Sequence, residues 1–325
     1  MTDSPLSAPT ARRRFARGSG GDRPFEAVVA LAALTVLVVL TAAGVSMFLG
    51  GEPAFKAFGL KFFVSTDWDA VNKQFGALIP IYGTLVTAAI SLLVGVPASF
   101  GIAFTLTETA PRWLRQPLMI AVELLASIPS IIYGMWGLFV FAPFMAAHVE
   151  PWLNDHFANT PLLSDLLTGP PIGIGMLTAG MILGVMIIPF ISSVMWSVFT
   201  AVPAHLKESA VALGATRTEV MFKVILPYTR NAVVGAIFLG LGRALGETMA
   251  VTFVLGNAHD FAKSLLMPGN SIAAVIANEF TEADSDLYRS SLIALGFVLF
   301  IVTFLVLAAA RLLLARLQRI EGAKV

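Results

Sequence analysis

The chain has few charged residues and no cysteine. Of its 325 residues, 13% are Asp, Glu, Lys or Arg and 57% are hydrophobic, whereas a typical soluble domain carries about 25% charged residues. The mean hydropathy is +0.83. This composition excludes an ordinary soluble domain and indicates a membrane protein. The absence of cysteine excludes disulfides, thiolate metal sites and cysteine nucleophiles.

Recognisable catalytic and nucleotide-binding motifs are also missing. No G-x-x-x-x-G-K-[ST] run occurs, so the chain lacks a phosphate-cradling P-loop. No serine lies in a G-x-S-x-G elbow. No H-E-x-x-H spacing or other close ligand spacing joins the four histidines, which are His148, His156, His205 and His259. We therefore predict that this chain is not an enzyme and binds no metal or cofactor of its own.

Six apolar runs are long enough to cross a bilayer, for which a helix needs about 20 residues. The sequence therefore predicts an all-α polytopic membrane protein with six transmembrane helices. The third and fourth runs contain prolines, which predict kinks or breaks that could expose backbone groups to a cavity. The predicted spans are Ala27–Leu49, Leu78–Leu106, Pro117–Ala147, Ile172–Val202, Asn231–Gly256 and Leu292–Leu314.

The distribution of Lys and Arg predicts the orientation of the chain. Of 21 such residues, 15 fall on the side that includes both termini and five on the opposite side, which predicts that both termini are cytoplasmic. The arginine-rich start at Ala11–Arg17 precedes an apolar run too long for a cleaved signal, so we expect an uncleaved anchor. The predicted organisation is a disordered basic tail (1–24), a peripheral first helix (25–50), a membrane domain (78–316) and a cytoplasmic tail (317–325).

Two opposite charges lie in the middle of the fifth span. A charge in mid-bilayer costs about 2.5–3.5 kcal/mol on insertion scales, so Arg243 and Glu247 are expected to face protein or water. Their i,i+4 spacing would place them on one helix face, where they could pair. They could hold helices together, or they could handle an anionic substrate, because guanidinium matches the geometry of oxyanions. In the second case Glu247 would compete with the anion for Arg243.

The third span holds further polar candidates. Glu123 is predicted to lie about two turns from the cytoplasmic end, where it could pair with a partner subunit, line the inner mouth of a path or snorkel to the interface. Ser127 and Ser130 flank Pro129. Their hydroxyls could bond backbone groups freed by the proline or touch substrate, and the first role is the commoner one in membranes.

The segment from Pro203 to Ala232, between the fourth and fifth spans, predicts two short helices meeting at a glycine. Residues 204–212 favour a helix that Gly214 ends, and a second helix is expected to run to Leu226, where Pro227 would stop it. This segment could be an amphipathic loop lying on the membrane.

The same segment resembles the E-A-A-x3-G-x9-I-x-L-P pattern of bacterial ABC importer membrane subunits, the binding-protein-dependent transport system inner membrane components. Ser209 replaces an alanine of the pattern and Val224 replaces its isoleucine. The resemblance implies the type I importer (MetI-like) fold, with the coupling helix within 203–228 seated on an ATPase. The residues that match the pattern, and would carry the coupling role, are Glu208, Ser209, Ala210, Gly214, Leu226 and Pro227.

Two further runs are similar to the phosphate importers of the Pst system. RALGETMA (Arg243–Ala250, which includes Thr248) and ASIPSIIYGMWGLFVFAP (Ala126–Pro143) resemble the PstC-type subunit. The resemblance implies a multi-pass protein of the bacterial inner membrane that takes up phosphate. Its implied partners are a PstA-type permease, two copies of a PstB-type ATPase that carry ATP and Mg²⁺, and a periplasmic PstS-type phosphate-binding protein.

Other functions remain open on the sequence alone. The chain could be the PstA-type partner, or a permease for sulfate or molybdate, since these are also oxyanions. An ion-coupled secondary transporter would use Glu123, Arg243 and Glu247 as a relay. A membrane scaffold or signalling subunit would need no substrate path.

Overall fold

The computed structural model describes residues 22–161 and 163–322. The predicted basic tail therefore lies almost wholly outside the described residues, as do the last residues of the predicted C-terminal tail. Helix α1 (Asp22–Phe58) is continuous and extends beyond the predicted end at Leu49. The chain divides into two compact units between Ser46 and Met47. The first unit holds most of α1, which is also the first of the six segments counted below, and the other elements belong to the second unit.

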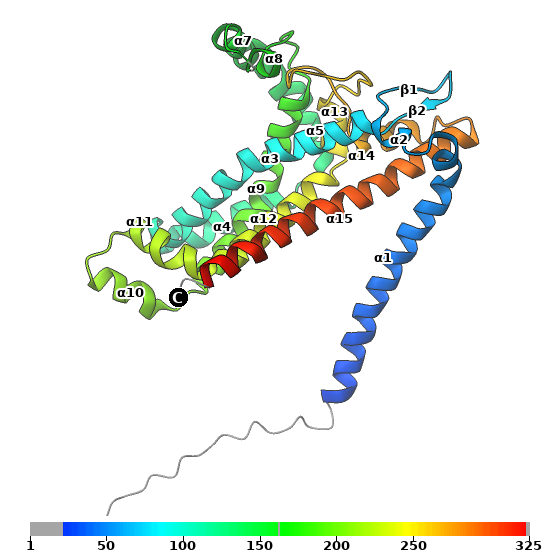
Figure 1. Cartoon of the computed structure of the whole chain (residues 1–325). Coiled ribbons are helices and arrows are strands. Elements are labelled where there is room, and N and C mark those ends of the chain that lie inside the picture. Colours follow the sequence, from blue (N-terminus) through cyan, green and yellow to red (C-terminus); the bar gives the residue numbers. More distant parts are fainter. Residues whose placement is uncertain (1–21, 162, 323–325) are drawn as a thin grey trace, which may run out of the picture. The chain divides into compact units, whose positions relative to one another are not determined.

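The core of the second unit is built on α3 (Leu78–Phe104) and α9 (Met176–Thr200). Figure 1 shows these helices beside α12 (Leu226–Leu245) and α15 (Asp286–Gly322). Glycines allow α3 and α9 to approach closely, since a Cβ at Gly180 would press into Ile90. Apolar side chains fill the space between the helices, among them Met186, Ile187, Ile191 and Leu241.

The third predicted span, Pro117–Ala147, is broken at one of its prolines, as the sequence predicted, and its first part lies on a separate helix. It divides into α4 (Arg112–Ala126) and a helical segment that begins with α5 (Ser130–Trp136). Pro129 stands at the N-cap of α5 with extended backbone, because proline lacks the N–H that a continuous helix needs. The second segment continues through η2 (Gly137–Phe141), α6 (Ala142–Phe144), η3 (Met145–Val149) and α7 (Glu150–Phe157).

The segment predicted as coupling helices agrees with the prediction in its first helix but differs from it at Pro227. Helix α10 (Ala204–Ala212) matches the prediction, but Pro227 does not stop a helix. Instead α11 (Arg217–Val220), η4 (Met221–Ile225) and α12 follow one another directly. Proline is tolerated in a first helical turn, and Pro227 occupies that position of α12, after the wider π-helical turn η4.

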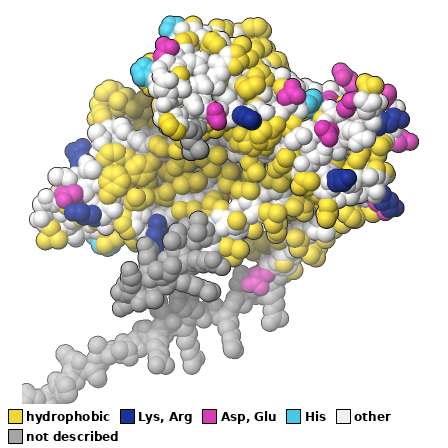
Figure 2. Space-filling model, turned by 45° about the horizontal axis from the view of Figure 1, so that its top comes forward, with side chains coloured by type: hydrophobic (Ala, Val, Ile, Leu, Met, Phe, Trp, Pro, Cys, Tyr) yellow, Lys and Arg dark blue, Asp and Glu magenta, His cyan; other side chains and the backbone are white. Residues whose placement is uncertain are grey.

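The fifth predicted span, Asn231–Gly256, is also interrupted. Helix α12 ends at Leu245, and the separate α13 begins at Met249 and ends at Val254. Six helical segments of the described chain are nevertheless long and apolar enough to cross a membrane, which agrees with the predicted number. Figure 2 shows hydrophobic side chains over the middle of the visible face and charged side chains mainly towards its edges.

The remaining elements gather beside the start of α3 and of α15. They are α2 (Lys61–Val64), the antiparallel strands β1 (Trp68–Asp69) and β2 (Gln74–Phe75), and α14 (Ile272–Glu279), while α8 (Leu163–Leu167) follows α7. This small hairpin is the only sheet in the described residues, and the sequence did not predict it.

Glu279, at the end of α14, joins these elements. Its Oε2 accepts hydrogen bonds from Trp68 Nε1 at 2.7 Å and from the Tyr288 hydroxyl at 2.6 Å. Its Oε1 lies 2.8 Å from His259 Nε2, and the His259 ring stacks on Trp68. We call these four residues the Glu279 cluster. One carboxylate thereby ties the hairpin, the loop before α14 and the start of α15 together.

Candidate functional site

Arg243 lies in the last turn of α12, close to α9. Its guanidinium carbon is 4.2 Å from the centroid of the Phe190 ring, a cation–π contact. The Nε atom of Arg243 is buried and has no hydrogen-bond partner. Among the described residues no ion pair joins a carboxylate to this guanidinium. The cation is therefore held by an aromatic face and keeps free donors.

Glu247 does not lie one turn along the same helix as Arg243, contrary to the sequence prediction. Helix α12 ends two residues before it, and Gly246 to Thr248 form a break. The carboxylate of Glu247 accepts a 3.4 Å hydrogen bond from the backbone N–H of Ala250, in the first turn of α13. The i,i+4 argument failed because it assumed a continuous helix, whereas the backbone leaves helical geometry after Leu245.

The broken third span packs against this break. A Cβ at Gly134 of α5 would press into Phe253 and the backbone of α13, so the glycine permits close contact between α5 and α13. Tyr133, also on α5, lies within electrostatic range of Arg243. Its hydroxyl donates a 2.9 Å hydrogen bond to the carbonyl of Leu125, across the Pro129 break. The two broken spans thus meet near Arg243.

The serine hydroxyls bond fewer of the backbone groups at the Pro129 break than the sequence suggests. Ser127 donates to the carbonyl of Glu123 at 3.5 Å, the limit of a hydrogen bond, and the hydroxyl of Tyr133 bonds a freed carbonyl instead. Neither Tyr133 nor Phe190 was a sequence candidate, because aromatic residues are common in membrane helices. Their proximity to prolines, Pro129 and Pro189, is the one sequence feature that they share.

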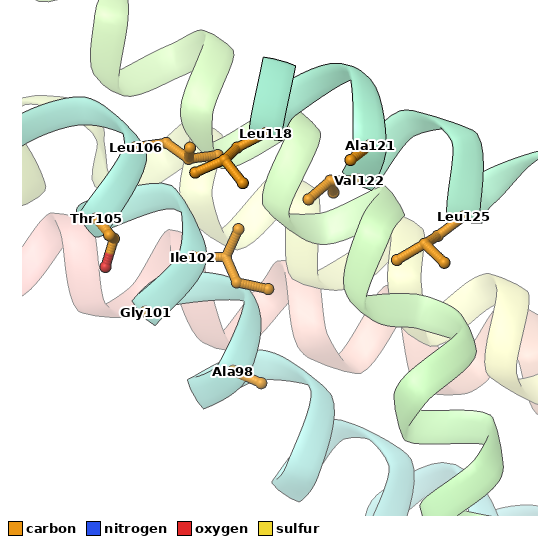
Figure 3. Close-up of a pocket in the computed structure, with 9 residues that line it drawn as sticks. All are labelled: Ala98, Gly101, Ile102, Thr105, Leu106, Leu118, Ala121, Val122 and Leu125. Carbon is orange, nitrogen blue, oxygen red and sulfur yellow. The ribbon is translucent and has the colours of Figure 1, made fainter. Parts of the chain in front are cut away.

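Glu123 lies outside the helices that are long enough to span, contrary to its predicted position inside the third span. It is exposed on α4, and its carboxylate makes no hydrogen bond or ion pair within the described chain. Helix α4 and α3 enclose a groove of about 580 Å³. Figure 3 shows its lining side chains, which include Ile102, Leu118 and Leu125. The groove carries no charged group, so it does not suit an anion.

The predicted coupling residues lie at the far end of α9 and α12. Glu208 and Ser209 are exposed on α10, and Ala210 is half-buried. Gly214 has a φ of +89° and no neighbour within 4 Å of a Cβ position, which explains why glycine ends this helix. Leu226 and Pro227 form the first turn of α12, not the end of a helix. The segment therefore presents α10 and the turn after it at the surface.

Sequence comparison decides the family. The model of the family described as "Binding-protein-dependent transport system inner membrane component" matches residues 95–319. The phosphate transport system permease protein PstC of Xylella fastidiosa (strain 9a5c) is 57% identical over 98% of both chains. The protein of the same name from Mesorhizobium japonicum is 53% identical over 96% of this chain and 94% of the relative. The chain belongs to this family of importer permeases, among its PstC-type members.

Solved structures agree on the fold of this permease. A bacterial ABC transporter chain involved in the import of the acidic polysaccharide alginate aligns with a TM-score of 0.59, at 17% identity, over 91% of this chain and 98% of that chain. At this identity the likeness shows the fold alone, which is that of type I ABC importer permeases. The chain is accordingly a multi-pass inner-membrane permease subunit and not an enzyme, since the ATPase of such an importer is a separate subunit.

Proposed function

We propose that this permease imports phosphate and that Arg243 is the residue of the path that binds it. The relatives that span nearly the whole chain are named as phosphate permeases. One observation on the site supports the proposal most strongly: the guanidinium of Arg243 rests on Phe190, pairs with no carboxylate among the described residues, and keeps a buried Nε without a hydrogen-bond partner there. Guanidinium donors match phosphate oxygens, often in pairs.

The contact with Phe190 suggests how phosphate is both bound and released. A cation–π contact holds the guanidinium in place but is weaker than paired charge-assisted hydrogen bonds. Phosphate would therefore replace the Phe190 ring as the contact of the Arg243 guanidinium. The cation–π contact would form again when phosphate leaves. Glu247 and Thr248 would border the path at the α12–α13 break. Ser127 and Ser130 would border it at the Pro129 break, with Glu123 towards the mouth of the path.

The proposed complex supplies what this chain lacks. A PstA-type permease would complete the path, and a periplasmic PstS-type protein would deliver phosphate. Two PstB-type ATPases, holding ATP and Mg²⁺, would bind the coupling segment through Glu208, Ala210 and Gly214. This arrangement requires that both termini and the coupling segment lie in the cytoplasm, as the excess of Lys and Arg on that side predicts.

The test is ATP-dependent uptake of labelled phosphate into proteoliposomes that hold the chain with these partners. Arg243→Gln removes the charge and should abolish uptake while the complex still assembles. Arg243→Lys keeps the charge but loses the forked donors, so it should retain only part of the uptake. Arg112→Gln, at an exposed arginine of α4, is the matched control and should transport normally.

Three results would overturn the proposal. If Arg243→Gln transports phosphate at the normal rate, the arginine does not bind the substrate. If sulfate suppresses uptake as effectively as unlabelled phosphate does, the permease carries another oxyanion. A complex that fails to assemble when Arg243 is replaced by either residue would assign Arg243 to helix packing alone.

A further inference from the structure

Glu108 lies where the end of α3 meets the coupling segment. It is in η1 (Thr105–Thr109), a π-helical turn that ends α3, and such turns are frequent at functional sites. Its Oε1 accepts a 3.1 Å hydrogen bond from Lys207 Nζ, on α10. Its backbone carbonyl accepts a 3.0 Å hydrogen bond from Arg217, on α11. One residue therefore receives a cation from each of the two short helices of the coupling segment.

Lys207 also connects a third element. Its Nζ donates a 3.1 Å hydrogen bond to the carbonyl of Phe199, in the last turn of α9. The side chains of Lys207 and Glu108 are 20% and 15% exposed. Partial burial strengthens such a pair, and losing one partner leaves the other charge poorly solvated. We call Glu108, Lys207 and Arg217 the Glu108 node.

The Glu108 node and the proposed ATPase-facing residues occupy different sides of α10. Lys207 points towards α3 and α9, whereas the next two residues, Glu208 and Ser209, are exposed. At the turn after α10, Leu213 is 90% exposed and Gly214 has open space around it. The coupling segment is thus fixed at its base and free at its tip.

From this geometry we propose that Glu108 is a positioning residue that makes the coupling segment and α3 move as one body. A displacement of α10 by the ATPase would pass through Lys207 and Arg217 to the end of α3, and through Lys207 to α9. Without the node, α10 could follow the ATPase while α3 stays behind. This inference concerns how ATPase motion reaches the spans. It rests on the proposed coupling to an ATPase but not on the choice of phosphate as substrate.

A distance measurement tests the inference without any transported substrate. Because the chain has no native cysteine, spin labels can be placed at Leu213→Cys, at the tip, and at Leu93→Cys, which is 77% exposed on α3. In the assembled transporter we expect one narrow distance distribution that is the same with and without ATP. Glu108→Gln and Lys207→Met should each broaden it or make it depend on ATP.

A matched control lies on the same segment. Lys223 forms an exposed i,i+4 ion pair with Glu219, at 3.0 Å, within the consecutive helical turns of α11 and η4, and this pair contacts neither α3 nor α9. Lys223→Met should leave the distance distribution unchanged. A broadening in this control equal to that in Glu108→Gln would contradict the proposal, because any lost charge would then suffice.

The second measurement is the number of phosphate ions imported per ATP hydrolysed. Glu108→Gln and Lys207→Met should hydrolyse ATP at a rate near normal but import several-fold less phosphate per ATP. Since both changes weaken the Glu108–Lys207 ion pair, the double variant should be little worse than the more severe single variant.

Four results would overturn the inference: a normal import ratio in both single variants, unchanged distances in both, additive losses in the double variant, or failure of both single variants to assemble with the ATPase. If the normal transporter imports no phosphate, the proposed substrate fails but the distance test still applies.

Discussion

The Glu279 cluster and the Glu108 node are each built around one largely buried carboxylate, yet their donors differ. Glu279 accepts from the neutral groups of Trp68 and Tyr288, together with His259. The carboxylate of Glu108 accepts from the charged amine of Lys207, and the backbone carbonyl of the same residue accepts from the guanidinium of Arg217. The first set of donors comes from closely packed elements, and the second comes from a segment whose tip has no support.

The difference indicates what each carboxylate does. Aromatic donors with stacked rings surround Glu279, where Phe75 also stacks on Tyr288, so this cluster fixes one arrangement. Long cationic side chains connect Glu108 to the two short helices of the coupling segment, so the segment and the end of α3 can shift together. We infer that the hairpin end of the permease, around Glu279, stays rigid and serves as an anchor. The end that carries the coupling segment and the Glu108 node moves, and serves as a lever.

The largest expected loss of stability is at the hairpin end of the permease, from Gly83→Ala. A Cβ on this residue of α3 would collide with the backbone carbonyl of Asn270, which is buried just before α14. The same contact region includes the 3.0 Å bond from the Ile272 N–H to the Thr84 hydroxyl. The change should lower the free energy of unfolding by about 3 kcal/mol or more, as expected for overpacking against backbone. Chemical unfolding of the purified permease in detergent measures it.

Gly235→Ala is the control for this substitution. Gly235 lies inside α12 with nothing within 4 Å of a Cβ, so alanine there should stabilise the helix by about 0.5–1 kcal/mol. If Gly83→Ala is as stable as the native chain, α14 does not pack on α3 as described.

Replacing Glu279 by alanine should have the next largest effect. The change leaves three donors, on Trp68, His259 and Tyr288, without their acceptor, and a partly buried charge-assisted network of this kind is worth about 2–3 kcal/mol. Thermal unfolding in detergent should therefore show a clear loss. Glu282→Ala removes an exposed carboxylate from the same segment and should change stability by less than about 0.5 kcal/mol. Equal losses in the two variants would refute the role of the cluster.

The stabilisation that the Glu279 cluster gives to the folded state should also decrease at acidic pH. Burial acts to raise the pKa of Glu279, but hydrogen bonds from His259, Tyr288 and Trp68 outweigh it, so the pKa is lowered from the usual 4.5. A lowered carboxyl pKa contributes stability that is fully present above pH 4.5 and is lost as the pH falls through the folded-state pKa. Unfolding of the native chain and of Glu279→Gln, compared from about pH 7 to about pH 3.5, should show this loss only in the native chain. Parallel curves would contradict it.

The smallest loss of stability is expected at the tip of the coupling segment, from Gly214→Ala. Its φ of +89° is unfavourable for alanine, but a Cβ there would meet no other atom. The cost should therefore be only the backbone strain, about 1–2 kcal/mol, well below that of Gly83→Ala. Chemical unfolding of the two variants, measured side by side, compares them. A loss at Gly214 equal to that at Gly83 would mean that the tip is packed as closely as the anchor.

Apolar runs, helix-forming residues and Gly214 correctly predicted the number of spans and helix α10. The apolar runs predicted six spans because length and composition alone decide whether a helix can cross a bilayer. Helix α10 was predicted because its helix formers are followed by Gly214, whose left-handed backbone excludes most other residues. The family resemblance also lay in this segment, where the spacing of Glu208, Ala210 and Gly214 is fixed by one short helix and its turn.

Predictions that placed the ends of helices from the sequence pattern alone failed. Glu247 was paired with Arg243 by helical spacing, but α12 ends at Leu245. Pro227 was expected to end a helix, but after a π-helical turn it begins one. Glu123 was assigned to a span, but the break at Pro129 leaves it on α4. In each case the backbone departs from regular geometry where other helices pack against it, and a periodic pattern contains no information about those neighbours.

The sequence by itself determined that this chain is a membrane permease and predicted its coupling segment, because hydrophobicity, charge distribution and a short local motif carry that information. Only the tertiary structure decided which groups meet Arg243, Glu108 and Glu279. Phe190 is 53 residues from Arg243 along the chain, and Lys207 is 99 residues from Glu108. Contacts over such separations depend on how helices pack, and many sequences with the same apolar pattern could place different side chains there.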